Sequence, residues 1–171
     1  MNGIPIHERS RHIDNRRSLG HWEGDFVSGT KNSHIATLVD RKSRYTIILR
    51  LRGKDSFSVN QALTEKFLSL PPELRQSLTW DRGMELARHL EFTGRTGVKV
   101  YFCDPQSPWQ LGTNENTNGL IRQYFPKKTC LAQYTQHELD QVAAQLNNRP
   151  RKTLKFKTPK EIIERGVALT D

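Results

Sequence analysis

Residues 21–51 read HWEGDFVSGTKNSHIATLVDRKSRYTIILRL, and this stretch decides the fold class. β-Branched and aromatic residues concentrate in three strand-like runs, His21–Val27, His34–Asp40 and Tyr45–Leu51. The connections between the runs are short and contain Gly, Asn and Ser, which favour turns. Because connections this short join antiparallel neighbours, the stretch predicts a three-stranded antiparallel meander.

Beyond residue 51 the pattern alternates between helix and strand. Apolar residues recur at intervals of three and four over Ser56–Leu70, and Glu85–Thr96 is typical of a second helix. Two short apolar runs, Ser77–Trp80 and Val98–Phe102, indicate buried strands. Alternating strands and helices form parallel βαβ units. The chain is therefore predicted to have an α/β fold, with a five-stranded mixed sheet of three meander strands plus two parallel strands, flanked by helices.

Local capping patterns predict where helices begin. Serine or threonine followed three residues later by glutamate or glutamine forms a capping box, and proline favours the first position of a helix. The patterns are Ser58 with Gln61, Thr135 with Glu138, and Thr158 before Pro159 with Glu161. A further helix is expected over roughly Asn114–Phe125.

The size and composition are those of one basic domain. The chain has 171 residues, 35% of them hydrophobic, a mean hydropathy of −0.72, a formal net charge of +9 and a pI near 9.8. Residues 1–18 contain four arginines and little apolar periodicity, so we expect a basic N-terminal arm on the surface. Residues 19–171 are expected to form the core domain with a C-terminal helical segment. The charge favours a polyanionic partner, with nucleic acid ahead of an anionic membrane.

Other features of the composition predict the cellular compartment and the type of metal site. No run of about 18 apolar residues is present and the N-terminus lacks the apolar core of a signal peptide, so we expect a cytoplasmic protein without a membrane partner. Cys103 and Cys130 are too far apart for a Cys-x-x-Cys motif and are expected to be free thiols. No histidine or cysteine pair has the spacing of a structural zinc site. Any metal is therefore expected to be a hard cation held by carboxylates.

Three acidic residues, Asp25, Asp81 and Glu115, are the candidate ligands. Asp25 ends the first strand, Asp81 follows the Ser77–Trp80 strand, and Glu115 lies near a helix start. Carboxylates from separate segments are the usual ligands of paired divalent cations, which activate a water or hydroxyl and stabilise a leaving oxygen in phosphoryl transfer. Each residue alone has another explanation, because aspartate forms turns and glutamate is favourable near a helix N-terminus.

The helix that carries Glu115 has an unusual polar face. Glu115, Gly119 and Arg122 fall within about 60° of one another on a helical projection. Because glycine weakens a helix, Gly119 indicates close approach of DNA or of another backbone segment, or is simply tolerated. Glu23 shares a strand face with Asp25 and is expected to be solvated, or else to support the site from behind the ligands. Asp40 is expected to be a turn residue.

Several ordered segments resemble the catalytic core of DDE transposases, specifically bacterial insertion-sequence transposases of the IS30 family, with retroviral integrase cores as more distant relatives. The resemblance runs from about His21 to about Ile163. Its segments are HWEGD at 21–25, LVDRKSRY at 38–45, LTWDRG at 78–83, YFCDPQSPW at 101–109, GTNENTNG at 112–119, LNNRPRK at 146–152 and TPKE at 158–161.

The resemblance implies both a fold and a function. The fold is ribonuclease-H-like, and Asp25, Asp81 and Glu115 are the metal-binding catalytic triad, with Asp81 and Glu115 spaced 34 positions apart. The implied activity is metal-dependent DNA cleavage and strand transfer at transposon ends, during transposition, recombination and integration. The cofactor is Mg²⁺, with Mn²⁺ as a substitute and two ions per site. The partners are transposon-end and target DNA, in a homodimer or larger synaptic assembly.

This sequence departs from the family pattern at two places. Relatives carry an N-terminal helix-turn-helix region that recognises transposon ends, and this chain begins just upstream of the core, so we expect end recognition to be absent. Leu111 stands where relatives usually have a basic residue, which removes one phosphate contact and is expected to weaken DNA binding. Neither departure affects the triad.

Basic and aromatic residues near these segments are candidate DNA contacts. Cations of this kind bind phosphates, although any single one is also explained as a solvated surface charge. The candidates are Arg82, Arg122, Lys127, Lys128, Arg149, Arg151 and Lys152, with Lys155, Lys157 and Lys160 extending the last group. Trp109 is a candidate for stacking on a base, or else a local hydrophobic anchor. Two alternative functions remain open: a non-catalytic or truncated DNA-binding module, and a ribonuclease-H-like nuclease.

Overall fold

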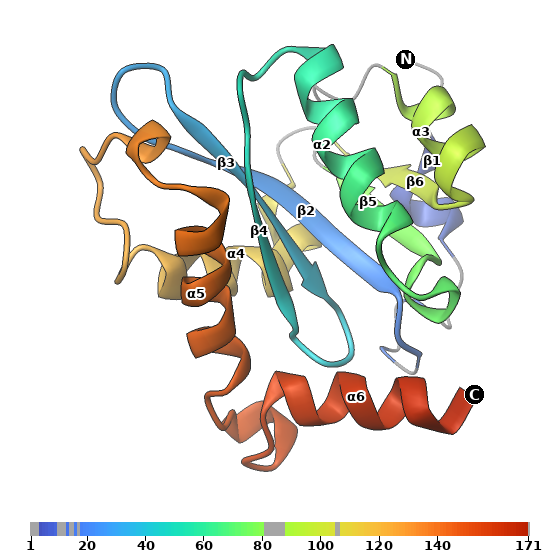
Figure 1. The fold of residues 1–171 in the computed structure, drawn as a ribbon. Helices are drawn as coiled ribbons and strands as arrows, with labels where there is room; N and C mark the ends of the chain where they lie inside the picture. The colour runs from blue at the N-terminus through green and yellow to red at the C-terminus, as the bar shows by residue number, and fades with distance from the viewer. Residues whose placement is uncertain are drawn as a thin grey trace.

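The computed structural model describes residues 4–9, 13, 16, 18–80, 88–104 and 107–170. A single mixed sheet forms the centre of the molecule, and helices cover both of its faces (Figure 1). The strands follow the order β1-β6-β5-β2-β3-β4 across the sheet. They are β1 (Ile4–Pro5), β2 (His21–Ser28), β3 (His34–Asp40), β4 (Thr46–Arg50), β5 (Ser77–Trp80) and β6 (Lys99–Phe102).

The strand pairing confirms the predicted meander and its parallel extension. Strand β3 pairs antiparallel with both β2 and β4, whereas β5 pairs parallel with both β2 and β6. The sheet has six strands where five were predicted, because Ile4–Pro5 adds β1 parallel to β6. The expected surface position of the N-terminal arm is wrong for Ile6 and Ile13, whose side chains are buried.

Two hydrophobic cores lie on opposite faces of the sheet, because successive strand residues point to opposite sides. One core packs helices α2 (Ser56–Leu68), α3 (His89–Thr96) and α6 (Pro159–Thr170) against Trp22, Leu78 and Trp80. The other packs α4 (Gly112–Ile121) and α5 (Gln136–Asn147) against Val27, Ile35 and Ile48. No helix in the described part of the chain is long and apolar enough to span a membrane.

The helix starts agree with two of the three capping predictions. Thr135 and Glu138 form the predicted capping box of α5, and the Glu161 backbone amide donates to the Thr158 hydroxyl at α6. The Ser58 prediction is wrong, because Asp55 is the N-cap residue of α2 and accepts a hydrogen bond from the Ser58 amide. Helix α4 ends at Ile121, earlier than predicted, and the part of the second predicted helix before Arg88 lies outside the described residues.

Two side-chain amides from α5 hydrogen-bond to the outer edge of β4. Asn147 accepts from the Thr46 amide at 2.7 Å and donates to the Thr46 carbonyl at 2.9 Å. Gln136 accepts from the Arg50 amide at 2.8 Å and donates to the Ile48 carbonyl at 2.7 Å. An amide side chain has a carbonyl and an N–H₂ group, so each one hydrogen-bonds as a neighbouring strand would. These bonds fix α5 along β4.

Candidate active site

Asp25 lies on β2 at the face of the sheet that α4 covers. Its ladder partner on β3 is Thr37, and the side chain is half-buried. One carboxylate oxygen, Oδ1, accepts a hydrogen bond from the Phe26 backbone amide at 2.8 Å. The other, Oδ2, accepts from Nδ2 of Asn118 on α4 at 3.4 Å. The carboxylate is therefore oriented by β2 and by α4 together.

The end of β5 lies beside Asp25. Trp80, the last residue of β5, pairs with Gly24 in the parallel ladder, and Asp25 follows Gly24. A Cβ atom on Gly24 would overlap the Trp80 ring, which explains why glycine precedes Asp25. The predicted ligand Asp81 follows Trp80 in the sequence and lies, with Arg82, outside the described residues.

Helix α4 is joined to the sheet by two asparagines one turn apart. The buried Asn114 donates from Nδ2 to the backbone carbonyls of Glu23 and Thr37, at 3.2 Å each. The Thr37 hydroxyl donates to Oδ1 of Asn118 at 2.9 Å. Glu115 lies next to Asn114 on an exposed flank of the helix. The sheet contacts thus fix the helix that carries Glu115, and Asn118 connects the same helix to Asp25.

A buried ion pair supports the first turn of α4. Nη1 of Arg41 lies 2.9 Å from Oε2 of Glu23, and the Glu23 side chain is fully buried. The backbone amide of Asn114 donates to Oε1 of Glu23 at 3.4 Å, and Nη1 of Arg16 lies 4.0 Å from Oε2. The expectation that Glu23 is solvated is therefore wrong, because packing of α4 against β2 removes it from water.

The side chains of two further arginines contact the first turn of α4. Arg16 and Arg44 both donate to the hydroxyl of Thr113. Burial lowers the pKa of Arg16 and the pKa of Arg44, and Glu23 acts in the opposite direction on both. The prediction that Asp40 is a turn residue is confirmed, because its carboxylate accepts hydrogen bonds from the Ser43 amide and hydroxyl. It is buried, and burial raises the pKa of its carboxyl group.

The described candidate residues have the chemistry that suits a hard divalent cation. Asp25 and Glu115 offer carboxylate oxygens, which such cations prefer. Glu115 is exposed in the first turn of α4. Within the described ranges no group of three histidine, cysteine, aspartate or glutamate residues is assembled. The third predicted ligand, Asp81, belongs to the range 81–87 that the structure does not describe.

Arg122 and Gly119 were predicted to share a helix face with Glu115, and the structure shows what surrounds each of them. Arg122 donates through Nη2 to the Ser28 carbonyl at 2.9 Å and through Nη1 to the Phe125 carbonyl at 3.4 Å, so it ties the end of α4 to β2. A Cβ atom on Gly119 would meet nothing within 4 Å, so no described backbone segment packs on it. Contact of Gly119 with another backbone segment is therefore not found among the described residues, and close approach of DNA stays a prediction.

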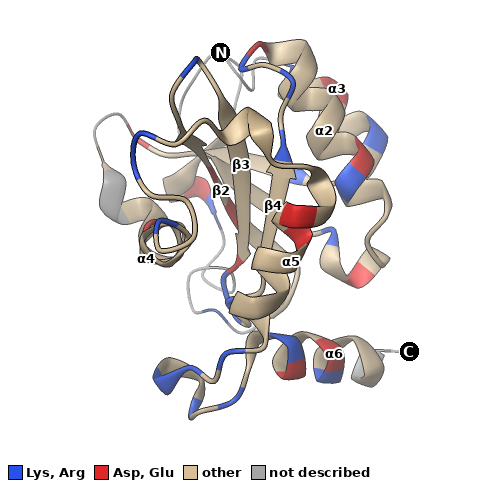
Figure 2. Ribbon diagram, turned by 60° about the vertical axis from the view of Figure 1, so that its left-hand side comes forward, with Lys and Arg blue, Asp and Glu red and all other residues tan. Residues whose placement is uncertain are grey.

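The other candidate DNA contacts lie on loops around the α4 and α5 ends. Lys127 and Lys128 are exposed after α4. Arg149 is half-buried and donates to the Tyr124 hydroxyl at 3.0 Å, while Arg151 is half-buried and Lys152 exposed in the segment that follows α5. Figure 2 shows basic residues in the loop beside α4 and in the segment between α5 and α6.

The turn before α4 explains the leucine at position 111. Pro108–Leu111 forms a single 3₁₀ turn, and Leu111 is buried with Ile6 and Cys103 in a small separate cluster. An apolar side chain suits this position because the N-terminal segment packs over it. The Trp109 side chain lies outside the described part, and its predicted stacking role stays a prediction. Cys103 and Cys130 are free thiols, as predicted.

Sequence reasoning missed the residues that connect α4 to the sheet. Asn114 and Asn118 are four positions apart and therefore share one face of the helix. Two amide side chains on one helix face are a sequence signal for hydrogen bonds to a neighbouring element, and here Asn114 is buried and Asn118 half-buried. No sequence signal links Glu23 with Arg41, because only the pairing of β2 with β3 brings the two residues together.

Comparisons with known proteins identify relatives of this chain. The family model described as "Integrase core domain" matches residues 15–108. The "Transposase InsI for insertion sequence element IS30C" of Escherichia coli (strain K12) is 93% identical over 171 residues, which is 100% of this chain and 45% of that protein. The "Transposase for insertion sequence element IS1086" of Cupriavidus metallidurans is 48% identical over 166 residues, which is 96% of this chain and 49% of that protein. The chain thus spans about half the length of these curated relatives.

A solved structure supports the fold assignment. The catalytic core domain of BIV integrase superposes with a TM-score of 0.67 at 16% sequence identity, covering 90% of this chain and 100% of that chain. At this identity the likeness concerns the fold alone. The sheet order, with a meander followed by parallel strands, is that of a ribonuclease-H-like core, as predicted.

Proposed function

Because this chain belongs to the integrase core domain family, among IS30-type insertion-sequence transposases, we propose that it is the catalytic core of a DNA transposase. The proposed reaction has two steps: hydrolysis of a phosphodiester bond at a transposon end, which releases a 3′-hydroxyl, and attack of that hydroxyl on a phosphodiester of target DNA. The second step joins the transposon end to the target and releases a target 3′-hydroxyl as the leaving group. The observation that carries the proposal is the hydrogen bond between Asn118 and Asp25, which connects a carboxylate at the β2–β5 junction to the helix that bears Glu115.

We propose Asp25, Asp81 and Glu115 as the residues that hold two divalent cations, with Mg²⁺ as the natural ion. When bound, such a pair activates the attacking hydroxyl and stabilises the leaving oxygen of an in-line displacement. Asp25 supplies an oxygen whose direction is set by the Phe26 amide and Asn118. Glu115 supplies a second oxygen from a helix held in place by Asn114. Neither side chain needs to form a covalent bond with DNA.

The proposed partners are transposon-end and target DNA. A basic chain with a net charge of +9 matches a polyanionic substrate. Joining two DNA ends requires two active sites in one assembly, so we propose a homodimer or larger synaptic complex. The protein would act in the bacterial cytoplasm, where its DNA substrate lies.

The triad is tested with Asp25→Asn, Asp81→Asn and Glu115→Gln in a strand-transfer assay on a pre-cleaved end. Loss of a metal ligand removes several kcal/mol of transition-state stabilisation, so each variant should be slower by roughly 100-fold or more. Binding to the same DNA in EDTA should stay within about threefold, because removing a negative charge does not weaken phosphate contacts. Glu91→Gln is the matched control, since Glu91 is exposed on α3.

Other outcomes identify the alternative functions. Unchanged activity in all three variants would point to a non-catalytic DNA-binding module. Metal-dependent hydrolysis of an RNA–DNA hybrid without strand joining would identify a nuclease. Mn²⁺ binding measured by calorimetry gives a second readout, and the three variants should lose it while the Glu91 control keeps it.

A further inference from the structure

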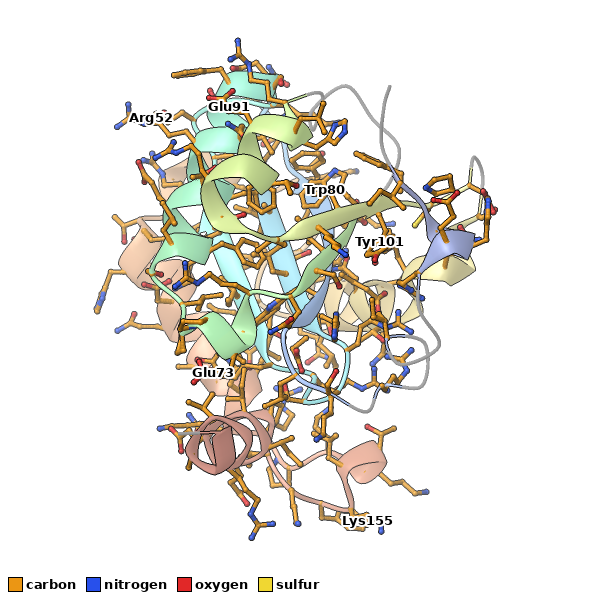
Figure 3. All side chains as sticks on the ribbon, turned by 90° about the vertical axis from the view of Figure 1, so that its right-hand side faces the viewer. Arg52, Glu73, Trp80, Glu91, Tyr101 and Lys155 are labelled. Carbon is orange, nitrogen blue, oxygen red and sulfur yellow. The ribbon has the colours of Figure 1, made fainter. Side chains whose placement is uncertain are left out.

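The segment between α5 and α6 forms a small projection that we call the basic hairpin, residues 149–157. An antiparallel bridge between Arg151 and Lys157 closes it, with the Arg151 amide donating to the Lys157 carbonyl at 3.0 Å. Within it, Lys152–Leu154 forms a 3₁₀ turn. Figure 3 shows Lys155 at the end of the molecule, well away from Trp80 and Tyr101 in the sheet.

The positive charge of the basic hairpin is not neutralised by the protein. No acidic residue occurs between positions 141 and 160. Among the described residues, no carboxylate lies within ion-pair distance of its cations. Those cations are Arg149, Arg151, Lys152, Lys155 and Lys157. Cations held close together without counter-charges attract a polyanion.

Phe156, which precedes the bridge residue Lys157 in the basic hairpin, is 70% exposed, more than any other large hydrophobic residue that the structure describes. Two successive residues, Lys155 and Phe156, have positive φ angles of 54° and 65°. Such a backbone conformation is unfavourable for residues other than glycine, asparagine and aspartate. The Phe156 amide donates to the Arg151 carbonyl at 2.8 Å, which fixes the backbone at this position. Backbone hydrogen bonds thus maintain an exposed phenyl ring among five cations.

DNA is the partner that fits this combination. A phosphate backbone satisfies the cations, and an unstacked base presents a flat apolar face to the ring. A second copy of this chain is disfavoured, because its equivalent hairpin would bring the same uncompensated charge. The exposed Phe57 on α2 differs, since the Arg88 guanidinium lies 5.7 Å from its ring centre.

We propose that the basic hairpin is a DNA-binding element in which the cations bind phosphates and the Phe156 ring stacks on a base at an open or distorted step. This inference rests on the proposed DNA substrate and adds a contact to it, separate from the carboxylate site. Because stacking does not involve charge, Phe156 contributes affinity that does not depend on salt. The lysines contribute the salt-dependent part of the affinity.

The test measures binding of the chain to a DNA duplex that contains a two-base gap, with the fluorescent base 2-aminopurine beside the gap. Binding is measured in EDTA across a series of salt concentrations. Phe156→Ala should weaken binding about tenfold with an unchanged salt slope, and should abolish quenching of 2-aminopurine. Phe156→Tyr should restore both. Lys155→Ala should lower the salt slope by about one phosphate contact. Phe57→Ala, an exposed phenylalanine on another surface, should behave as the unmodified chain does.

Three results would overturn the proposal. One is an unchanged affinity and fluorescence of Phe156→Ala. Another is a change in sedimentation of Phe156→Ala without DNA, which would assign the ring to contact between copies. The third is binding to vesicles of equal phosphatidylserine and phosphatidylcholine that depends on Phe156 while DNA binding does not. Because no metal is present, the result is independent of catalysis: Asp25→Asn should show the same Phe156 effect whether or not the strand-transfer proposal holds.

Discussion

At the scale of single residues, Asn118 controls the geometry of the site with one side chain. Its Nδ2 donates to Asp25 and to Oδ1 of Asn114 at 3.2 Å, and its Oδ1 accepts from Thr37. Each hydrogen bond is worth about 1 kcal/mol, but their main effect is to fix one orientation of the Asp25 carboxylate. In the proposed reaction, Asn118 would therefore act through Asp25, as a positioning residue.

Replacement of Asn118 by alanine is predicted to slow strand transfer by about 10- to 100-fold, the usual cost of removing a group that orients a metal ligand. The KM for DNA should change little, and the loss should be smaller in Mn²⁺ than in Mg²⁺ because Mn²⁺ tolerates less regular coordination. Asn116→Ala is the matched control, since Asn116 is exposed on the same helix. An Asn118→Ala chain with an unchanged kcat would exclude the positioning role.

The buried Asp40 predicts a pH dependence of folding. Burial raises its pKa above the ordinary value, so the folded state binds a proton more tightly than the unfolded state. This contribution to the free energy of unfolding is complete below the unfolded pKa of about 3.9 and is lost as the pH rises through the raised folded value. The difference in unfolding free energy between the unmodified chain and Asp40→Asn should therefore fall over that range in urea titrations. A difference that is constant or rises with pH would contradict the assignment.

At the scale of elements, α4 is a polar helix held to the sheet by side-chain hydrogen bonds as well as by apolar contacts. Asn114 and Thr117 are buried on the same helix that exposes Glu115 and Gly119. Apolar packing of α4 is concentrated near its end, at Ile121. The helix thus presents an open polar surface beside the carboxylates.

Gly119→Ala is predicted to stabilise the fold by about 0.5–1 kcal/mol, because alanine is the better helix former and its Cβ would meet nothing within 4 Å. If DNA lies against this surface, the same change should weaken DNA binding. Gly94→Ala on α3 is the control, since a Cβ there also meets nothing within 4 Å. It should stabilise the chain in urea unfolding and leave DNA affinity unchanged. Equal DNA affinity of both variants would place the DNA elsewhere.

The fold was predictable from the sequence where local patterns determine it. Strands β2 and β3 follow from runs of β-branched and aromatic residues with a short connection, and β5 follows from a short apolar run. The α5 start follows from Thr135 and Glu138. Strand β1 was not predictable, because a two-residue strand depends on pairing with β6 almost a hundred positions away. The Asp25 and Glu115 candidates came from their sequence contexts. The Asn118 contact and the Glu23–Arg41 pair depend on packing between distant segments, and so only the structure reveals them.

At the scale of the whole molecule, the excess positive charge is distributed over loops and over the segment between α5 and α6, while acidic residues occur on α2, α5 and α6 (Figure 2). The buried Glu23–Arg41 pair contributes nothing to this external field. The external positive charge therefore comes from exposed side chains such as Lys127, Lys128 and Lys152.

DNA binding is predicted to weaken steeply with salt. Each phosphate contact releases counterions, and roughly six to ten contacts would lower the affinity by about 10³- to 10⁵-fold between about 50 and 200 mM salt. Fluorescence anisotropy with a random-sequence duplex measures the slope. A flat dependence would show that phosphate contacts do not dominate binding, and the charge pattern would then need another explanation.

The amides of Gln136 and Asn147 along β4 also have a consequence for how copies of this chain can associate. An unpaired sheet edge recruits strands from other molecules and promotes aggregation. Here backbone groups of Thr46, Ile48 and Arg50 on that edge already have partners from α5. Joining two sheets edge to edge at β4 would require α5 to detach first, so we expect copies of this chain not to associate in a fibril-like manner through this edge.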